Sequence, residues 1–152
     1  MGTLLVGLAL LACGATAPEA PPAPQVEDEQ PENGAEDGFG ESCVANNEGA
    51  CVYWGRTARS LGEDYEQYLK PSCERGHGYS CLLYGEYRKE DGADASVTAP
   101  IYQRACENGA GDGCLRWADS LEGEERQKVL EKGCALQSVW SCKNAGLPTP
   151  TW

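Results

Sequence analysis

The chemistry that this sequence offers most clearly is that of paired thiols. Eight of its nine cysteines form four pairs, and seven residues separate the two members of every pair. Successive pairs begin 30, 33 and 28 residues apart, a period typical of repeat proteins. Because the spacing is constant within pairs and variable between them, the geometry within the pair must be constrained. The pairs are Cys43 and Cys51, Cys73 and Cys81, Cys106 and Cys114, and Cys134 and Cys142.

Disulfides explain this spacing better than zinc ligands do. Residues eight apart in one helix are separated by about 12 Å, whereas a disulfide needs Cα atoms within about 7 Å. The chain must therefore reverse inside each pair, and Asn or Gly turn formers stand there in the first three pairs. Zinc ligands typically have about two to four residues between them, no C-x-x-C occurs here, and His77 is the only histidine. We predict four disulfides in an oxidising compartment, each joining the end of one helix to the start of the next.

A rival connectivity would instead close each helix pair at its base. It would leave Cys43 to reach Cys142 across the whole array. Its sequence separations of 22, 25 and 20 residues vary, which a fixed local geometry does not favour. The rival pairs are Cys51–Cys73, Cys81–Cys106 and Cys114–Cys134.

The ninth cysteine, Cys13, follows an apolar run that is too short to cross a bilayer and has the length of a signal-peptide core. Leu10-Leu11-Ala12-Cys13 resembles a bacterial lipobox, in which the cysteine is lipidated and becomes the mature N-terminus. The resemblance implies a lipoprotein signal peptide at residues 1–12. It also implies an outer-membrane lipoprotein that faces the periplasm or the cell surface. The alternative is a buried N-terminal helix with a free thiol.

Residues 13–42 are rich in proline and alanine and contain eight acidic residues but no lysine or arginine. Such a segment has too little apolar surface to offset its ordering entropy, so we predict a disordered acidic tether. The tether carries −8 of the formal net charge of −12. The rest of the chain has 16 acidic and 12 basic residues and no basic stripe, which argues against nucleic acid as a partner.

An aromatic residue followed by a small one recurs shortly after the second cysteine of a pair, as Trp54-Gly55, Tyr84-Gly85 and Trp117-Ala118. In a helix this is a packing pattern, because the ring fills a hole and the small residue lets a neighbouring helix approach. We expect these A helices at residues 49–61, 79–90, 113–121 and 139–145.

Apolar residues also recur five and four positions before the first cysteine of the last three pairs. They predict B helices at residues 64–74, 96–108 and 124–137. Ser96 is expected to cap the second B helix, so that Pro100 costs no helical hydrogen bond. Pro71 removes a hydrogen bond to Gln67, so we expect it to kink or fray the end of the first B helix.

Aligned on its cysteines, the segment 43–146 resembles the Sel-one-like repeats, which are relatives of the tetratricopeptide repeat. The likeness is closest to the cysteine-rich, Hcp-type secreted proteins of bacteria, whose pattern is K-A-C, seven residues, then C-x-x-L-G. Arg104-Ala105-Cys106 followed by Cys114-Leu115-Arg116-Trp117-Ala118 is the nearest match. The resemblance implies an all-α, α/α solenoid of about three and a half disulfide-joined helix pairs, with residues 147–152 as a C-terminal tail.

In that family the A helices line the concave side of the solenoid. The resemblance therefore implies a partner-binding strip, because positions one, five and eight after the second cysteine share a helix face. Its charges are basic at one end and acidic at the other, which suits a protein or peptide partner; ordinary surface charge is the alternative. The strip comprises Val52, Arg56, Arg59, Leu82, Glu86, Lys89, Leu115, Asp119 and Glu122.

Some Hcp-type relatives carry a penicillin-binding or β-lactamase label, which makes a hydrolase acting on cell-wall or β-lactam substrates the alternative function. The sequence contains no S-x-x-K, S-D-N, K-T-G or G-x-S-x-G, and His77 stands in a Gly-His-Gly turn. Glu124 and Glu125 fit a helix N-terminus as complements of its dipole. We predict no enzyme, no cofactor and no metal site. A membrane-anchored scaffold that binds envelope proteins or peptides is favoured, and a purely structural envelope component remains open.

Overall fold

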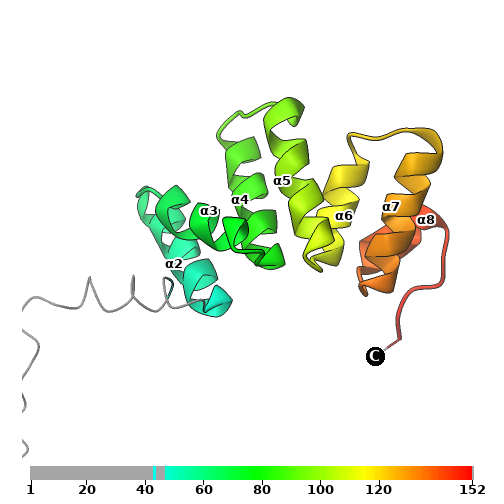
Figure 1. The fold of residues 1–152 in the computed structure, drawn as a ribbon, viewed down its shortest axis with the longest axis horizontal. Helices are drawn as coiled ribbons and strands as arrows, with labels where there is room; N and C mark the ends of the chain where they lie inside the picture. The colour runs from blue at the N-terminus through cyan, green and yellow to red at the C-terminus, as the bar shows by residue number, and fades with distance from the viewer. Residues whose placement is uncertain (1–42, 44–46, 152) are drawn as a thin grey trace, which may run out of the picture. The chain divides into compact units, whose positions relative to one another are not determined.

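The computed structural model describes Cys43 and residues 47–151, so the predicted signal peptide and tether lie outside the described residues. Those residues form seven α-helices and no strand, which confirms the all-α class. The helices follow one another in chain order, each packed against the next (Figure 1). They are α2 (Glu48–Leu61), α3 (Glu66–Glu74), α4 (Gly78–Glu90), α5 (Ala95–Glu107), α6 (Gly111–Ala118), α7 (Gly123–Ala135) and α8 (Val139–Ala145).

The A helices α2, α4, α6 and α8 form one layer of the repeat region. Each packs on its B neighbours, and α2 also contacts α4, α4 contacts α6, and α6 contacts α8. The B helices α3, α5 and α7 do not pack on one another to this extent within the described residues. Helices that lie closer together on one side curve the stack towards that side, so the A helices line its inner surface.

Close approach between A and B helices depends on small residues, as the sequence predicts. A Cβ on Gly85 would lie 2.5 Å from Cε1 of Tyr102, and one on Gly55 would lie 2.5 Å from Cγ of Leu69. Leu69, Tyr102 and Leu130 stand four residues before the first cysteine of their pairs, and all three are buried. The B helices thus supply the large core side chains, and the A helices supply the gaps that receive them.

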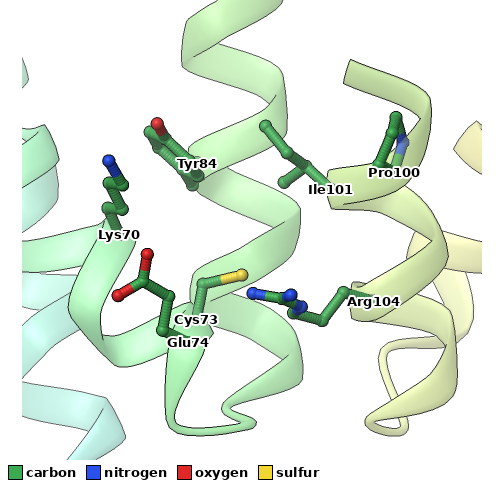
Figure 2. Close-up of a pocket in the computed structure, with 7 residues that line it drawn as sticks. All are labelled: Lys70, Cys73, Glu74, Tyr84, Pro100, Ile101 and Arg104. Atoms are coloured by element: carbon green, nitrogen blue, oxygen red, sulfur yellow. The ribbon is translucent and has the colours of Figure 1, made fainter. Parts of the chain in front are cut away.

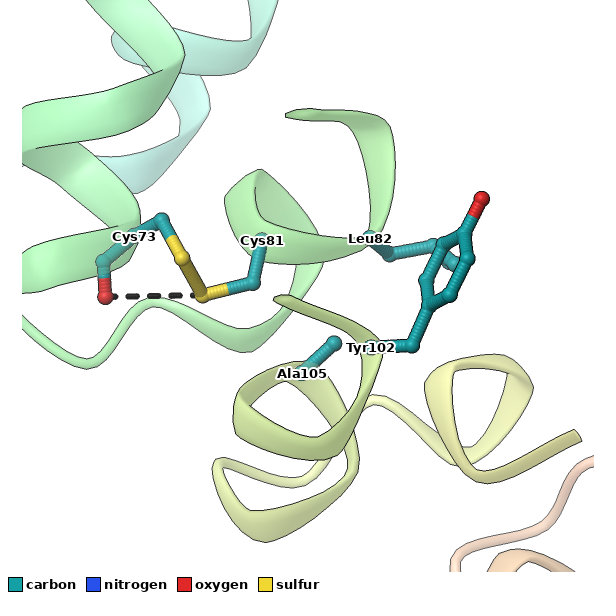
Figure 3. Close-up of a cluster of buried hydrophobic side chains, with 5 residues drawn as sticks. All are labelled: Cys73, Cys81, Leu82, Tyr102 and Ala105. Carbon is teal, nitrogen blue, oxygen red and sulfur yellow. Dashed lines mark hydrogen bonds between the residues drawn. A yellow bond between two sulfur atoms is a disulfide. The ribbon is translucent and has the colours of Figure 1, made fainter. Parts of the chain in front are cut away.

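All four predicted disulfides are present. Their Cα–Cα distances are 4.5 Å in the first three and 4.4 Å in the last. Figure 3 shows the second disulfide beside Leu82, Tyr102 and Ala105, with Sγ of Cys81 3.4 Å from the carbonyl oxygen of Cys73. A disulfide sulfur carries no hydrogen, so this is a sulfur–oxygen contact. The bond therefore joins a B helix to the following A helix inside the core.

The reversal inside the second, third and fourth rings uses a left-handed residue three positions after the first cysteine. Gly76 (φ 92°) and Gly109 (φ 90°) take this position in the second and third rings. The fourth ring contains no glycine, and Gln137 adopts φ 66° there, the only positive φ of a non-glycine residue in the described chain. The ring geometry is therefore kept where the sequence shows no turn signal.

Two expectations about the B helices need correction, one in full and one in part. Asp94, not Ser96, caps α5: its carboxylate accepts hydrogen bonds from the backbone N–H of Ser96 at 2.9 Å and of Val97 at 3.2 Å. A hydrogen bond from the Ser96 hydroxyl, followed by these two backbone bonds, holds the pKa of Asp94 below its ordinary value. The helix starts one residue earlier than predicted, so Pro100 lies too deep to spare the helical bond. Pro71 does not fray α3, because the helix continues through it to Glu74; the alternative, a kink at Pro71, stays a prediction.

Helix α6 ends at Ala118, three residues earlier than predicted. The hydroxyl of Ser120 donates to the carbonyl oxygen of Trp117 at 2.7 Å, which satisfies one carbonyl of the last turn. The backbone then turns through Gly123 (φ 57°) into α7. The shorter helix changes which residues the A layer presents, as described below.

Gln137 offers a direct test of the ring geometry. A left-handed backbone costs an ordinary residue about 1–2 kcal/mol, and glycine removes that cost while adding about 0.5–1 kcal/mol of chain entropy to the unfolded state. Gln137→Gly should therefore raise the free energy of unfolding by about 0.5–1 kcal/mol. Gly109→Ala, the matched opposite change, should lower it by about 1 kcal/mol or more. Urea unfolding followed by circular dichroism measures both, and a loss of stability in Gln137→Gly would contradict this account.

Reduction should unfold the repeats rather than loosen them. A nine-residue ring contributes about 2.5 kcal/mol on the chain-entropy model, so four rings sum to about 10 kcal/mol, similar to the whole stability of a typical domain. The helical circular dichroism signal at neutral pH should collapse when a thiol reductant is added. The double variant Cys134→Ala and Cys142→Ala, which removes one terminal ring, should remain folded with a lower urea midpoint. Retention of the full helical signal after complete reduction would refute this prediction.

Candidate functional site

The inner surface of the A layer contains a hollow of about 300 Å³ formed by α4, α6 and α8. Leu82, Glu86 and Leu115 of the predicted strip line it, so the structure brings these three residues together. Apolar side chains form much of the wall, and charged groups stand among them. We call this hollow the A-layer groove, and its full lining is Tyr79, Leu82, Leu83, Glu86, Asp112, Leu115, Arg116 and Trp140.

Three lining residues that the sequence interpretation missed share one repeat position. Tyr79, Asp112 and Trp140 each precede the second cysteine of their pair by two residues. This position lies three residues before the first strip position, so it belongs to the same helix face. Extending the strip by one helical turn towards the N-terminus of each A helix would have found all three residues.

The two aromatic residues of the groove are exposed, and a cationic side chain lies against the ring of each. Tyr79 is 43% exposed and Trp140 is 60% exposed. Arg56 donates to the Tyr79 hydroxyl at 2.6 Å, and its guanidinium carbon lies 5.6 Å from the ring centroid. Nζ of Lys143 lies 4.6 Å from the centroid of the Trp140 ring. Each ring thus presents both an apolar face and a positive charge to an incoming ligand.

The acidic groups of the groove are already engaged. Glu86 forms an ion pair with Arg116, with Oε1 and Nε 2.7 Å apart, and Asp112 accepts a hydrogen bond from the Ser138 hydroxyl at 2.6 Å. The Tyr102 hydroxyl is buried without a well-aligned hydrogen bond. Its pKa is raised, first by burial and then by the nearby Glu86 carboxylate. The positive charges beside the rings are therefore the ones best placed for a partner.

Apart from Arg56, which lies on the Tyr79 ring, the remaining strip residues do not form one surface with the groove. Lys89 and Asp119 line a second hollow of about 230 Å³ near the turn between α4 and α5. Val52 is half-buried on α2. The assignment of Glu122 to an A helix is wrong, because α6 ends earlier and Glu122 is the residue before α7.

Arg59, also predicted for the strip, serves the packing of α2 against its neighbours. It pairs with Asp91 at 2.6 Å and with Glu90 at 3.2 Å, and it lies 5.3 Å from the ring centroids of both Tyr65 and Tyr87. The Tyr65 hydroxyl also donates to Asp91. This hydrogen bond, followed by the Arg59 interactions, holds the pKa of Asp91 below its ordinary value.

A third hollow, of about 140 Å³, lies beside the B helices α3 and α5 (Figure 2). Tyr84, Pro100 and Ile101 contribute apolar surface, and Lys70 and Arg104 approach from α3 and α5. The volume is far below the range of about 300–1,000 Å³ typical of ligand sites. We therefore place the candidate site in the A-layer groove.

His77 is not simply a solvated loop residue. Its Nδ1 lies 2.8 Å from Oγ of Ser72, and that hydroxyl lies 2.8 Å from Oγ of Ser80. Both serines are fully buried, so neither hydroxyl can reach a substrate. The chain of contacts satisfies polar groups between α3 and α4. In the part of the chain that the structure describes, no group of three or more acidic, histidine or cysteine side chains is arranged for a metal ion.

The Asp91 cluster predicts how stability depends on pH. A lowered carboxyl pKa in the folded state contributes stability above the unfolded pKa of about 3.9, and this contribution is lost as pH falls through the folded value. Asp91→Asn should therefore be less stable than the unsubstituted chain at pH 7, and the difference should shrink below about pH 4. Thermal melts across this range measure the effect. Glu63→Gln, at an exposed carboxylate, is the control; a pH-independent deficit in Asp91→Asn would contradict the assignment.

Within the described residues, no helix combines the length and the apolar character needed to cross a bilayer. Comparisons with protein-family models, with curated proteins and with solved structures found no match to this chain.

Proposed function

We propose that this chain is a membrane-anchored helical-repeat scaffold whose A-layer groove binds an extended segment of another protein in the bacterial envelope. One observation carries the proposal: two exposed aromatic rings, Tyr79 and Trp140, line the same hollow from helices on either side of α6. Tyrosine and tryptophan dominate protein-binding surfaces, because each combines a large apolar area with a polar handle.

The rigidity of the groove also supports binding rather than catalysis. Tyr79 and Trp140 both lie inside disulfide-closed rings, so their backbone positions are held before any partner arrives. A preformed surface loses little conformational entropy on binding. The charged groups of the groove are paired with each other or stacked on rings, an arrangement that orients a ligand and offers no activated nucleophile.

The covalent chemistry supports the proposed cellular setting. Four disulfides favour an oxidising compartment such as the periplasm or the cell surface. The lipobox-like Leu10-Leu11-Ala12-Cys13 supports anchoring through a lipid on Cys13, and the likeness to Sel-one-like repeats supports a scaffold role. Residues 1–42 lie outside the described residues, so the lipid anchor is part of the proposal.

Substitution of one ring tests the groove. In crosslinked, detergent-solubilised envelope, Trp140→Ala should reduce capture of the partner about tenfold or more, because a central tryptophan at an interface typically contributes at least about 2 kcal/mol. Leu61→Ala is the control, since Leu61 is 66% exposed on α2 and does not line the hollow. Quantitative mass spectrometry compares the captured proteins. Equal capture by Trp140→Ala and Leu61→Ala would refute the proposal.

Lipidation has a separate test. Cleavage before Cys13 and acylation of its sulfur should incorporate a clickable fatty-acid analogue in the unsubstituted chain. Cys13→Ser should carry no label and should leave the membrane fraction. Label that persists on the serine variant would show that the anchor is not at this residue.

A further inference from the structure

We propose that the fourth disulfide, Cys134–Cys142, is a redox switch for the A-layer groove. A dithiol protein opens this bond, and the groove then loses the wall that α8 supplies. The inference rests on the proposed function, because it assigns a mode of regulation to the same groove. Two independent features carry it: the exposure of one cysteine and the weak attachment of one helix.

One of the eight paired cysteines is much more accessible than the others. Cys134 is half-buried, whereas the other seven are each at most 4% exposed. Its Sγ lies 3.9 Å from the carbonyl oxygen of Pro148, an exposed residue of the C-terminal tail. The second and third disulfides are instead packed among buried side chains such as Tyr102 and Leu130. Exchange requires that a thiolate reach a sulfur atom, so the fourth ring should react first.

The exchange begins when a thiolate of the reductant attacks Sγ of Cys134. A new S–S bond joins the two proteins, the bond to Cys142 breaks, and the Cys142 sulfur leaves as a thiolate that takes up a proton. The second thiolate of the reductant then attacks its own sulfur in the mixed disulfide and releases Cys134 as a thiol. Two electrons thus pass to this chain, and the dithiol reductant becomes a disulfide.

Helix α8 buries little besides this disulfide. Its buried residues are Ser141 and Cys142, and its largest side chain, Trp140, is 60% exposed. By contrast, α4 also buries Leu82 and packs between two B helices, α3 and α5. Helix α8 packs on α7 and α6 and has seven residues, too few for a helix to persist alone in water. Its position therefore depends on the covalent link more than that of α4 does.

Hydroxyl groups join α8 to the start of α6. The Ser141 hydroxyl donates to the carbonyl oxygen of Gly111 at 3.2 Å, and the Ser138 hydroxyl donates to Asp112 at 2.6 Å. Water can replace such bonds at a small net cost once the groups are exposed. Opening the fourth ring should therefore release α8 while the preceding helices stay folded.

Release of α8 removes one side of the groove. Trp140 lies inside the fourth ring and lines the hollow, and Lys143, which stacks on its ring, lies on the same helix. Tyr79 and Leu115 stay on α4 and α6. A partner would then find one of the two exposed rings and its cation displaced, so the oxidised chain binds and the chain with an open fourth ring does not.

Staged reduction of the full, oxidised chain tests the order of opening. Reduced thioredoxin is the probe dithiol, free thiols are alkylated at intervals, and mass spectrometry of proteolytic peptides locates the label. Cys134 and Cys142 should be alkylated at least tenfold faster than the other paired cysteines, while most of the helical circular dichroism signal remains. Alkylation of another pair first, or of all eight cysteines together, would overturn the inference.

Hydrogen exchange measures whether α8 leaves its position. When only the fourth ring is open, amides of residues 139–145 should exchange at least tenfold faster than in the oxidised chain, and those of α4 should not change. The double variant Cys134→Ala and Cys142→Ala reproduces the open ring without a reductant and should show the same pattern. Unchanged protection of α8 after the ring opens would also overturn the switch.

Partner capture separates this inference from the proposed function. From crosslinked, detergent-solubilised envelope, the chain opened at the fourth ring should capture at least fivefold less partner, and reclosure with oxidised glutathione should restore capture. Capture that depends on Trp140 but not on the state of the ring would leave the proposed function intact and exclude the switch. Equal capture by Trp140→Ala and the unsubstituted chain would instead refute the proposed function, whatever the order of reduction.

Discussion

The closed ring of nine residues is the constraint on which the rest of the structure depends. It fixes the distance and direction between the end of each B helix and the start of the next A helix, at Cα separations of 4.4–4.5 Å. All four A helices, α2, α4, α6 and α8, begin inside such a ring. The A helices pack on one another because these starts are set at a regular spacing. The groove is a product of that regularity, since its lining comes from three consecutive A helices at equivalent positions.

The second requirement is the small residue that faces each large B-helix side chain. Gly55 receives Leu69 and Gly85 receives Tyr102, with no space left for a Cβ at either glycine. The ring brings the two helices together at one end, and this complementarity keeps them together along their length. Neither feature would suffice alone, because a short helix pair without a packed interface has little to oppose its conformational entropy.

Much of this fold could be predicted because disulfide geometry and packing leave regular traces in a sequence. The constant cysteine spacing determined the pairing, and the aromatic–small pattern located the A helices. Boundaries were harder to predict where one local hydrogen bond decides them. Asp94 and Ser96 are both good caps, and Ser120 ends α6 through a single bond to Trp117. Gln137 gave no signal at all, because glutamine is not a residue type that favours the left-handed backbone it adopts at the end of α7.

The candidate site was predicted only in part. The strip was derived from positions after the second cysteine, so it included Leu82, Glu86 and Leu115 and omitted the helix turn inside the ring. It also included Arg59, whose charge is used by Asp91 and two tyrosine rings. Helix periodicity shows which residues share a face, but it does not show which charges on that face are already paired.

The ring position two residues before the second cysteine also bears on how such a chain can diversify. It is occupied by Gly49, Tyr79, Asp112 and Trp140, which differ in size, charge and polarity, while the backbone around each is covalently closed in the same way. A residue at this position can therefore change without disturbing the core, because Cys51, Cys81, Cys114 and Cys142 bear the structural role. Recognition and folding are encoded by different residues of the same short loop. New ligand preferences can consequently arise by single substitutions. Duplication of a helix pair adds one more variable position to the binding surface.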